Sequence, residues 1–270
     1  MINIVNKQSA KYIFLIIFFI FITFLLHGKD VNWSENYFPF SAEVLGSGNT
    51  FSSDLSANYI SPALKGNSNI YFSTSFLKSN AQIYYFVYGI KNFTFDLFYY
   101  DWNKIEWRDE MGRDLGYYYS SNYSGSVSYI HSLNKFKGGM QIRYNLKEIG
   151  STRETRVFFS PFLYYNIDIV DAGITLKDYK NKNIIIFGGF NYRFLKLKTR
   201  IDYYNEEYKF NYGCDFYLNE KNNYVLFLGA ADKKFTAGFG INSDNIKFSY
   251  GFIIENEQFF VNNFGLKIEI

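Results

Sequence analysis

Few residues in this chain of 270 could carry acid–base, nucleophilic or metal chemistry. It holds two histidines, His27 and His131, and one cysteine, Cys214. A serine hydrolase needs a histidine held against a serine and an acid, yet His131 stands at an expected strand end beside a turn. One histidine and one cysteine in distant segments match no metal-ligand spacing, and no glycine-rich loop could cradle a phosphate. We therefore expect no catalytic residues, no metal and no cofactor, and a protein that is not an enzyme.

Basic residues are more informative, because they recur at alternate positions of otherwise apolar runs. A dry protein core would not accept such charges unpaired, whereas a wet channel would. The residues concerned are Arg143, Lys147, Lys196, Lys198 and Arg200. They could attract an acidic head group such as a carboxylate. Equally, they could be neutralised in structural pairs by Asp96, Asp202 and Asp215, and the sequence leaves both interpretations open.

The elements that would position these charges are β-strands. Aromatic residues make up 22% of the chain and Pro only 3 residues, and mean hydropathy is −0.17 although 48% of residues are apolar. Interleaved apolar and polar residues give that combination, and period-two alternation places them on opposite faces of a strand. Phe93, Phe95 and Leu97 share one face, for example, while Thr94 and Asp96 share the other.

From residue 69 to residue 270 this alternation repeats between turn signals. We expect about fourteen strands, starting near residues 69, 81, 93, 123, 137, 156, 169, 183, 196, 208, 223, 234, 245 and 259. Pro161 interrupts the sixth run and predicts a bulge or kink there. The longest loop is expected from Asp101 to Ser121, where mixed charges and two tryptophans could form a recognition surface or an ordinary external loop.

A soluble β-sandwich also alternates, but three features favour a membrane barrel. Run lengths fit the roughly 9–11 residues of a tilted transmembrane strand. Tyrosine clusters at run ends fit interfacial girdles; they are Tyr84-Tyr85, Tyr99-Tyr100, Tyr117 to Tyr119, Tyr164-Tyr165 and Tyr203-Tyr204. Mid-strand charges fit a wet lumen. The predicted fold is all-β, a transmembrane antiparallel β-barrel of about fourteen strands over residues 69–270, in contact with outer-membrane lipid.

The N-terminus has the pattern of a targeting segment. Lys7 and Lys11 precede an unbroken apolar run from Tyr12 to Leu26, followed by Gly28. This is a basic region and an apolar core near the upper length for a signal peptide, and it is short for a spanning helix. We expect residues 1–28 to be a cleaved signal that directs the chain to the bacterial outer membrane. Without them the net charge is near zero, which gives no case for nucleic acid.

Residues 29–68 have no clean period, but the run from Ser52 to Leu64 resembles a motif of FadL-like and PorV/PorQ-like outer-membrane proteins. The matching positions are Asp54, Ser56, Ala57, Tyr59, Pro62 and Ala63, and Gly46 falls on one of the glycines that precede the motif in the family. Ser53 and Ser61 depart from the family pattern, which has Asp and Asn there. The resemblance implies a fourteen-stranded barrel whose N-terminal segment folds into the lumen as a hatch; a disordered periplasmic tail is the alternative.

The resemblance also implies functions. In the FadL branch the barrel takes up long-chain fatty acids or other hydrophobic molecules and releases them sideways through the wall. In the PorV branch it serves a secretion system and handles exported proteins. We expect passive transport of a hydrophobic or amphipathic small molecule; the alternative is a secretion-associated or structural barrel with a protein partner at the cell surface. A general porin is a further possibility, and a lumen enzyme lacks acid–base residues.

Overall fold

The structure is a computed structural model. It describes residues 41–47, 50, 58–64, 70–77, 81–108, 111–167, 169–178, 183–204, 206–219, 223–231, 234–243, 245–255 and 259–269. The expected signal peptide, residues 1–28, lies outside the described residues. Everything below concerns the compact unit from Pro39 to Ile270.

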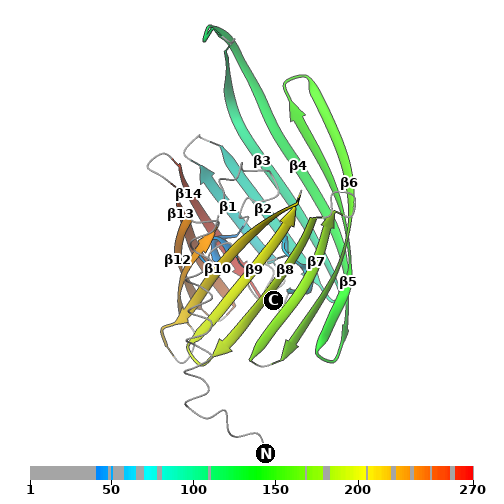
Figure 1. The fold of residues 1–270 in the computed structure, drawn as a ribbon, viewed down its shortest axis with the longest axis vertical. Coiled ribbons are helices and arrows are strands. Elements are labelled where there is room, and N and C mark those ends of the chain that lie inside the picture. The colour runs from blue at the N-terminus through cyan, green and yellow to red at the C-terminus, as the bar shows by residue number, and fades with distance from the viewer. Residues whose placement is uncertain are drawn as a thin grey trace, which may run out of the picture. The chain divides into compact units, whose positions relative to one another are not determined.

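Fourteen antiparallel strands in the described residues form one closed barrel (Figure 1). They are β1 (Ile70–Leu77), β2 (Gln82–Ile90), β3 (Phe93–Arg108), β4 (Asp114–Leu133), β5 (Phe136–Ile149), β6 (Thr152–Ile167), β7 (Val170–Asp178), β8 (Asn183–Tyr192), β9 (Leu195–Tyr204), β10 (Glu207–Tyr217), β11 (Tyr224–Ala231), β12 (Lys234–Ser243), β13 (Ile246–Glu255) and β14 (Phe259–Ile268). Each strand pairs with its neighbours in sequence, and β1 pairs with β14 from Ile70↔Ile268 to Leu77↔Val261. The predicted fold class and strand count are confirmed.

Alternation gives the wall two different faces. In β3, Phe93, Phe95 and Leu97 are exposed on the outer face, whereas Thr94 and Asp96 are buried on the inner face. The same division runs through the other strands. Apolar residues on the outside and polar residues on the inside are the arrangement of a barrel in lipid.

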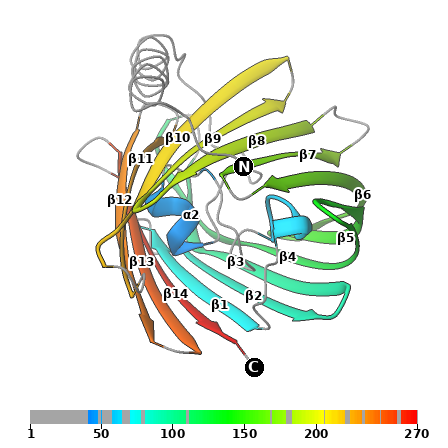
Figure 2. The same ribbon diagram turned by 90° about the horizontal axis from the view of Figure 1, so that it is seen from below.

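Two short helical segments precede the strands and lie inside the ring. They are α2 (Ala42–Gly46) and the 3-10 turn η3 (Pro62–Leu64). Figure 2 shows α2 within the barrel, where it packs against β11 to β14, while η3 packs against β4, β5 and β6. No helix in the described residues is long and apolar enough to cross a membrane.

The predicted loop from Asp101 to Ser121 is wrong. β3 continues to Arg108 and β4 begins at Asp114, so most of this segment forms a long hairpin that rises above the other strands in Figure 1. The pairing of β3 with β4 shifts between Asp101 and Lys104 and again between Trp107 and Arg108. Each shift interrupts the alternation of apolar and polar residues. For this reason the sequence of these strand ends was interpreted as a loop. β6 also starts earlier than expected, at Thr152.

The predicted bulge at Pro161 is wrong as well. The β5–β6 ladder runs through Met140↔Pro161 without a shift. Pairing with β7 instead begins at Phe162, next to the proline that lacks a backbone donor. The interruption therefore falls on one side of β6, and the described residues from Thr152 to Pro161 have no ladder pair with β7.

Three of the predicted girdle tyrosines also face the lumen rather than the outside. Tyr85, Tyr100 and Tyr164 are buried, because adjacent residues of a strand cannot share a face. Their neighbours Tyr84 and Tyr99 do face outward. On that face Tyr99 stacks on Tyr123 at 4.8 Å and on Tyr84 at 6.1 Å between ring centroids, and its hydroxyl donates to Asp101 at 3.1 Å.

The outer face provides a direct test of membrane insertion. Leu97 is 63% exposed, and a soluble protein would tolerate Arg at such a position. Inside hydrocarbon, Leu97→Arg should lower the free energy of unfolding by about 2–4 kcal/mol. The measurement is urea-dependent folding into lipid vesicles.

Met111→Arg is the matched control, because Met111 is 78% exposed at the tip of the long hairpin. That substitution should leave folding unchanged. Equal effects of both substitutions would contradict the placement of Leu97 in lipid.

Candidate functional site: the lumen and the segments inside it

Asp96 is the centre of a polar network on the inner wall. Its Oδ2 accepts from Arg143 Nη2 at 2.8 Å, from Asn58 Nδ2 at 2.7 Å and from the hydroxyl of Ser126. Gln141 Nε2 in turn donates to Ser126 Oγ at 2.9 Å. These residues come from β3, β4, β5 and the segment before β1, so one carboxylate joins three strands to the internal segment.

Most of the basic residues that the sequence singled out are buried in ion pairs. Lys196 Nζ lies 2.7 Å from Asp171, Lys198 Nζ 2.5 Å from Asp215, and Arg200 Nε 2.7 Å from Asp202. With Arg143–Asp96, four of the five candidates have an aspartate partner. Lys147, half-buried on β5, also has an interaction. Of the two interpretations that the sequence left open, these contacts favour structural pairs.

The helix α2 is attached to the wall by polar contacts as well as by the buried apolar side chains of Val44 and Leu45. Ser41 caps it by accepting from the Val44 amide at 3.4 Å. Glu43 forms an ion pair with Lys247 of β13 at 2.8 Å. Just after the helix, Ser47 Oγ donates to Asp215 at 2.6 Å and accepts from Lys198 Nζ at 3.2 Å.

Glycines allow α2 to approach this closely. A Cβ on Gly213 would overlap the carbonyl of Ser47, and a Cβ on Gly251 would overlap the carbonyl of Ala42. Gly46 itself lies against Phe227, whose Cβ would be 2.9 Å from an added Cβ. The family-like Gly46 is therefore at a position where backbone meets wall, which only glycine permits.

Residues 58–64 contact the opposite part of the wall mainly through apolar side chains. Ile60, Ala63 and Leu64 are buried in a cluster with wall residues of β4, β6 and β8; these are Ile130, Phe162, Tyr164, Ile185 and Phe187. Between this cluster and Asp96 lies Tyr59, whose ring is 5.1 Å from the Arg143 guanidinium and 4.4 Å from Lys177 Nζ. Burial raises the pKa of Tyr59, so its hydroxyl stays neutral.

The residues of the family-like motif divide into two sets. Gly46, Tyr59, Pro62 and Ala63 lie inside the barrel; Pro62 and Ala63 are fully buried and Tyr59 partly. Asp54, Ser56 and Ala57 lie outside the described residues.

Glu43, Asn58, Asp171 and Lys177 are among the lumen residues that sequence reasoning missed. Asp171 and Lys177 belong to β7, where alternation is weak. Glu43 and Asn58 precede the strands, where no periodic signal exists.

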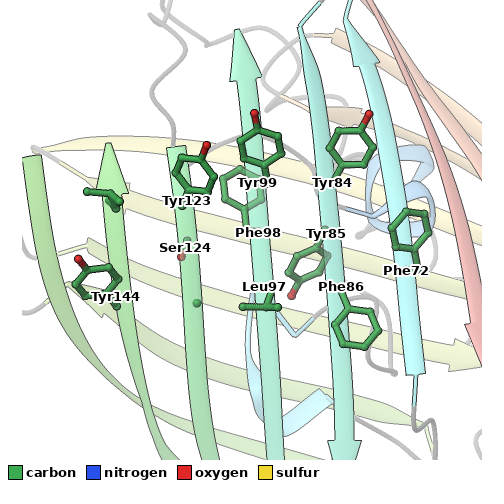
Figure 3. Close-up of a pocket in the computed structure, with 12 residues that line it drawn as sticks. Phe72, Tyr84, Tyr85, Phe86, Leu97, Phe98, Tyr99, Tyr123, Ser124 and Tyr144 are labelled. Carbon is green, nitrogen blue, oxygen red and sulfur yellow. The ribbon is translucent and has the colours of Figure 1, made fainter. Parts of the chain in front are cut away.

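A cavity of about 480 Å³ lies on the other side of the wall (Figure 3). Gly125 of β4 leaves a gap beside Leu97, because it has no side chain. Rings from neighbouring strands surround the gap, including Phe72, Phe86 and Tyr144. Figure 3 shows the row of Tyr84, Tyr99 and Tyr123 along one side of it. The lining is almost entirely apolar and can hold a hydrocarbon chain or ring.

The residues with catalytic potential are scattered. His131 is exposed near the end of β4, and Cys214 lies on β10, where its Sγ donates to the Leu228 carbonyl at 3.6 Å. In the part of the chain that the structure describes, no three His, Cys, Asp or Glu side chains are grouped so as to hold a metal.

Known structures share this architecture. The toluene transporter TodX of Pseudomonas putida superposes with a TM-score of 0.54 at 9% identity, covering 84% of this chain and 96% of TodX. The Acinetobacter baumannii outer-membrane protein Omp33 gives a TM-score of 0.50 at 6% identity, covering 75% of this chain and 98% of Omp33. The chain has the fold of an outer-membrane β-barrel. No family model and no curated sequence matches it.

Removal of the Asp96 carboxylate should cause a large loss of stability. Asp96→Ala leaves Arg143 buried without its partner, which should lower the free energy of unfolding by about 3–5 kcal/mol. Removing both charges, in Asp96→Asn with Arg143→Gln, should cost less than the single change. Urea unfolding of the barrel in detergent measures these differences.

The exposed pair of Glu154 and Arg156 supplies the control. Glu154→Ala should cost at most about 1 kcal/mol, as surface pairs do. If Asp96→Ala proved equally mild, Asp96 would not have the central role described.

Proposed function

We propose that this barrel is a passive transporter of hydrophobic or amphipathic small molecules across the outer membrane. The observation that carries the proposal is the placement of α2 and residues 58–64 inside the closed barrel. Side chains from these segments contact wall residues on two sides of the lumen, which argues against a wide, water-filled porin. A molecule that crosses must displace them or pass along them.

The chemistry of the lumen supports an amphipathic cargo. Ile60, Leu64 and Phe162 form an apolar surface beside the Asp96 network. Polar and apolar groups therefore stand next to each other between the segment and the wall. The outer cavity beside Gly125 adds an apolar site on the lipid side. The fold shared with a toluene transporter and the resemblance to FadL-like proteins agree with this proposal.

Transport should depend on movement of the internal segment. Ser47 and Asp215 are in side-chain contact, so cysteines are introduced at both positions, in a Cys214→Ser background, to fix α2 to β10 by a disulfide whose formation is verified by mass spectrometry. In proteoliposomes, uptake of a long-chain fatty acid or toluene should fall at least about tenfold after oxidation, since a covalent link prevents displacement. Reduction should restore it.

The single variant Ser47→Cys, treated in the same way, is the control and should keep its uptake. Undiminished uptake by the oxidised double variant would show that α2 does not move during transport. Absence of uptake of either compound by the unmodified barrel would contradict the proposed function itself.

A second function, docking of a protein partner, is favoured by the long hairpin of β3 and β4. This hairpin extends past the row formed by Tyr84, Tyr99 and Tyr123. Replacing residues 104–119 with a short turn should leave folding and small-molecule uptake intact and abolish capture of an exported protein partner, measured by pull-down. A stable partner that still binds the shortened barrel would exclude the hairpin as its docking site.

A further inference from the structure

One buried cation of the lumen differs from the others. Lys177 projects inward from β7, and its Nζ is buried without a hydrogen-bond partner among the described residues, although part of the side chain remains accessible. An ammonium has three donors and no acceptor. A buried charge of this kind is costly unless an anion or acceptor compensates it.

Three other inward lysines are each compensated by a carboxylate. Lys196, Lys198 and Lys247 each lie within 2.8 Å of a carboxylate oxygen, from Asp171, Asp215 and Glu43 respectively. No ion pair of this kind connects Lys177 to a described carboxylate. Lys177 therefore lacks the compensation that the wall and α2 give to these three lysines.

The charged groups around Lys177 do not supply the missing negative charge. The charged groups that act on it are Arg143, Asp96, Arg200 and Asp202. Asp96 is paired with Arg143, and Asp202 with Arg200. The net charges of these two pairs cancel, so Lys177 in its protonated form gives the described group one excess positive charge.

The remaining neighbour is Tyr59 of the internal segment. Lys177 Nζ lies 4.4 Å from the centre of its ring, a cation–π distance. This contact involves the ring face and leaves the ammonium hydrogens unbonded. Since Tyr59 stays neutral, it offers no negative charge. Beside the same ring, Arg143 Nε is a second buried donor without a described partner.

We propose that the lumen binds a monovalent anion at the ammonium of Lys177, next to Tyr59. One excess positive charge selects a single negative charge, and the unbonded ammonium hydrogens would donate to it. The anion is either a free halide or the carboxylate of an amphipathic molecule. The second source rests on the proposed transport function, because it would place the charged end of the cargo between β7 and the internal segment; the first does not.

The test uses the full-length folded barrel in a non-ionic detergent. Chloride binding is measured by line broadening in chloride NMR, and octanoate binding by calorimetry. Lys177→Met should weaken binding of the anion at least about tenfold, the loss expected for one charge-assisted hydrogen bond. Lys177→Arg keeps the charge and should retain most of the binding.

Lys135→Met is the control for loss of a positive charge, because Lys135 is exposed in the turn between β4 and β5; it should bind as the unmodified protein does. Thermal unfolding of each variant establishes that it is folded. Chloride and octanoate competing for the Lys177-dependent site would identify the carboxylate source, and chloride binding alone would identify the halide source. If neither anion binds, or if binding is unaffected by Lys177→Met, the anion site is overturned. Neither result bears on transport of uncharged molecules such as toluene.

Discussion

Closure of the sheet is the constraint on which the rest of this molecule depends. A strand edge in hydrocarbon leaves backbone donors and acceptors unsatisfied, and no water is present to satisfy them. All eight residues of β1 pair with β14, so the first and last strands have no open edge along this ladder. Once the sheet is closed, period-two alternation assigns every side chain to the lipid or to the lumen. The inward position of Asp96 and the outward position of Leu97 follow from that single assignment.

Charges that are directed inward must then be compensated inside. The wall achieves this with pairs from neighbouring or nearby strands, such as Lys196 of β9 with Asp171 of β7 and Lys198 of β9 with Asp215 of β10. The internal segments form hydrogen bonds with the same ion pairs. Ser47 joins the Lys198–Asp215 pair, and Asn58 joins the Arg143–Asp96 pair. The segments are therefore attached through hydrogen bonds to the ion pairs of the wall.

The strands could be predicted from the sequence wherever alternation is regular. Twelve of the fourteen strands begin within one residue of the expected position, and the exceptions are β4 and β6. The start of β4 was predicted wrongly because bulges in its pairing with β3 shift the period-two alternation. Adjacent tyrosines such as Tyr84 and Tyr85 were wrongly assigned to the same face. The pairing of Arg143 with Asp96 spans β3 and β5 with β4 between them, so it depends on two registers that one sequence does not reveal. Contacts of Glu43 with Lys247 join positions 204 apart, and no local pattern predicts them.

The two internal attachments differ in their share of polar contact, and this difference bears on how the lumen could open. α2 is held by backbone fitted against Gly213 and Gly251, by charged groups that water or an ion can replace, and by the apolar side chains of Val44 and Leu45. Residues 58–64 are held by an apolar cluster around Ile60 and Leu64, which water replaces poorly and a hydrophobic molecule replaces well. Asn58 and Tyr59 connect that cluster to the charged network. A molecule with an apolar body and a polar end would therefore compete for both kinds of contact at the second attachment, whereas a small polar solute would compete only for the polar contacts. These are the contacts that the proposed amphipathic cargo would have to replace.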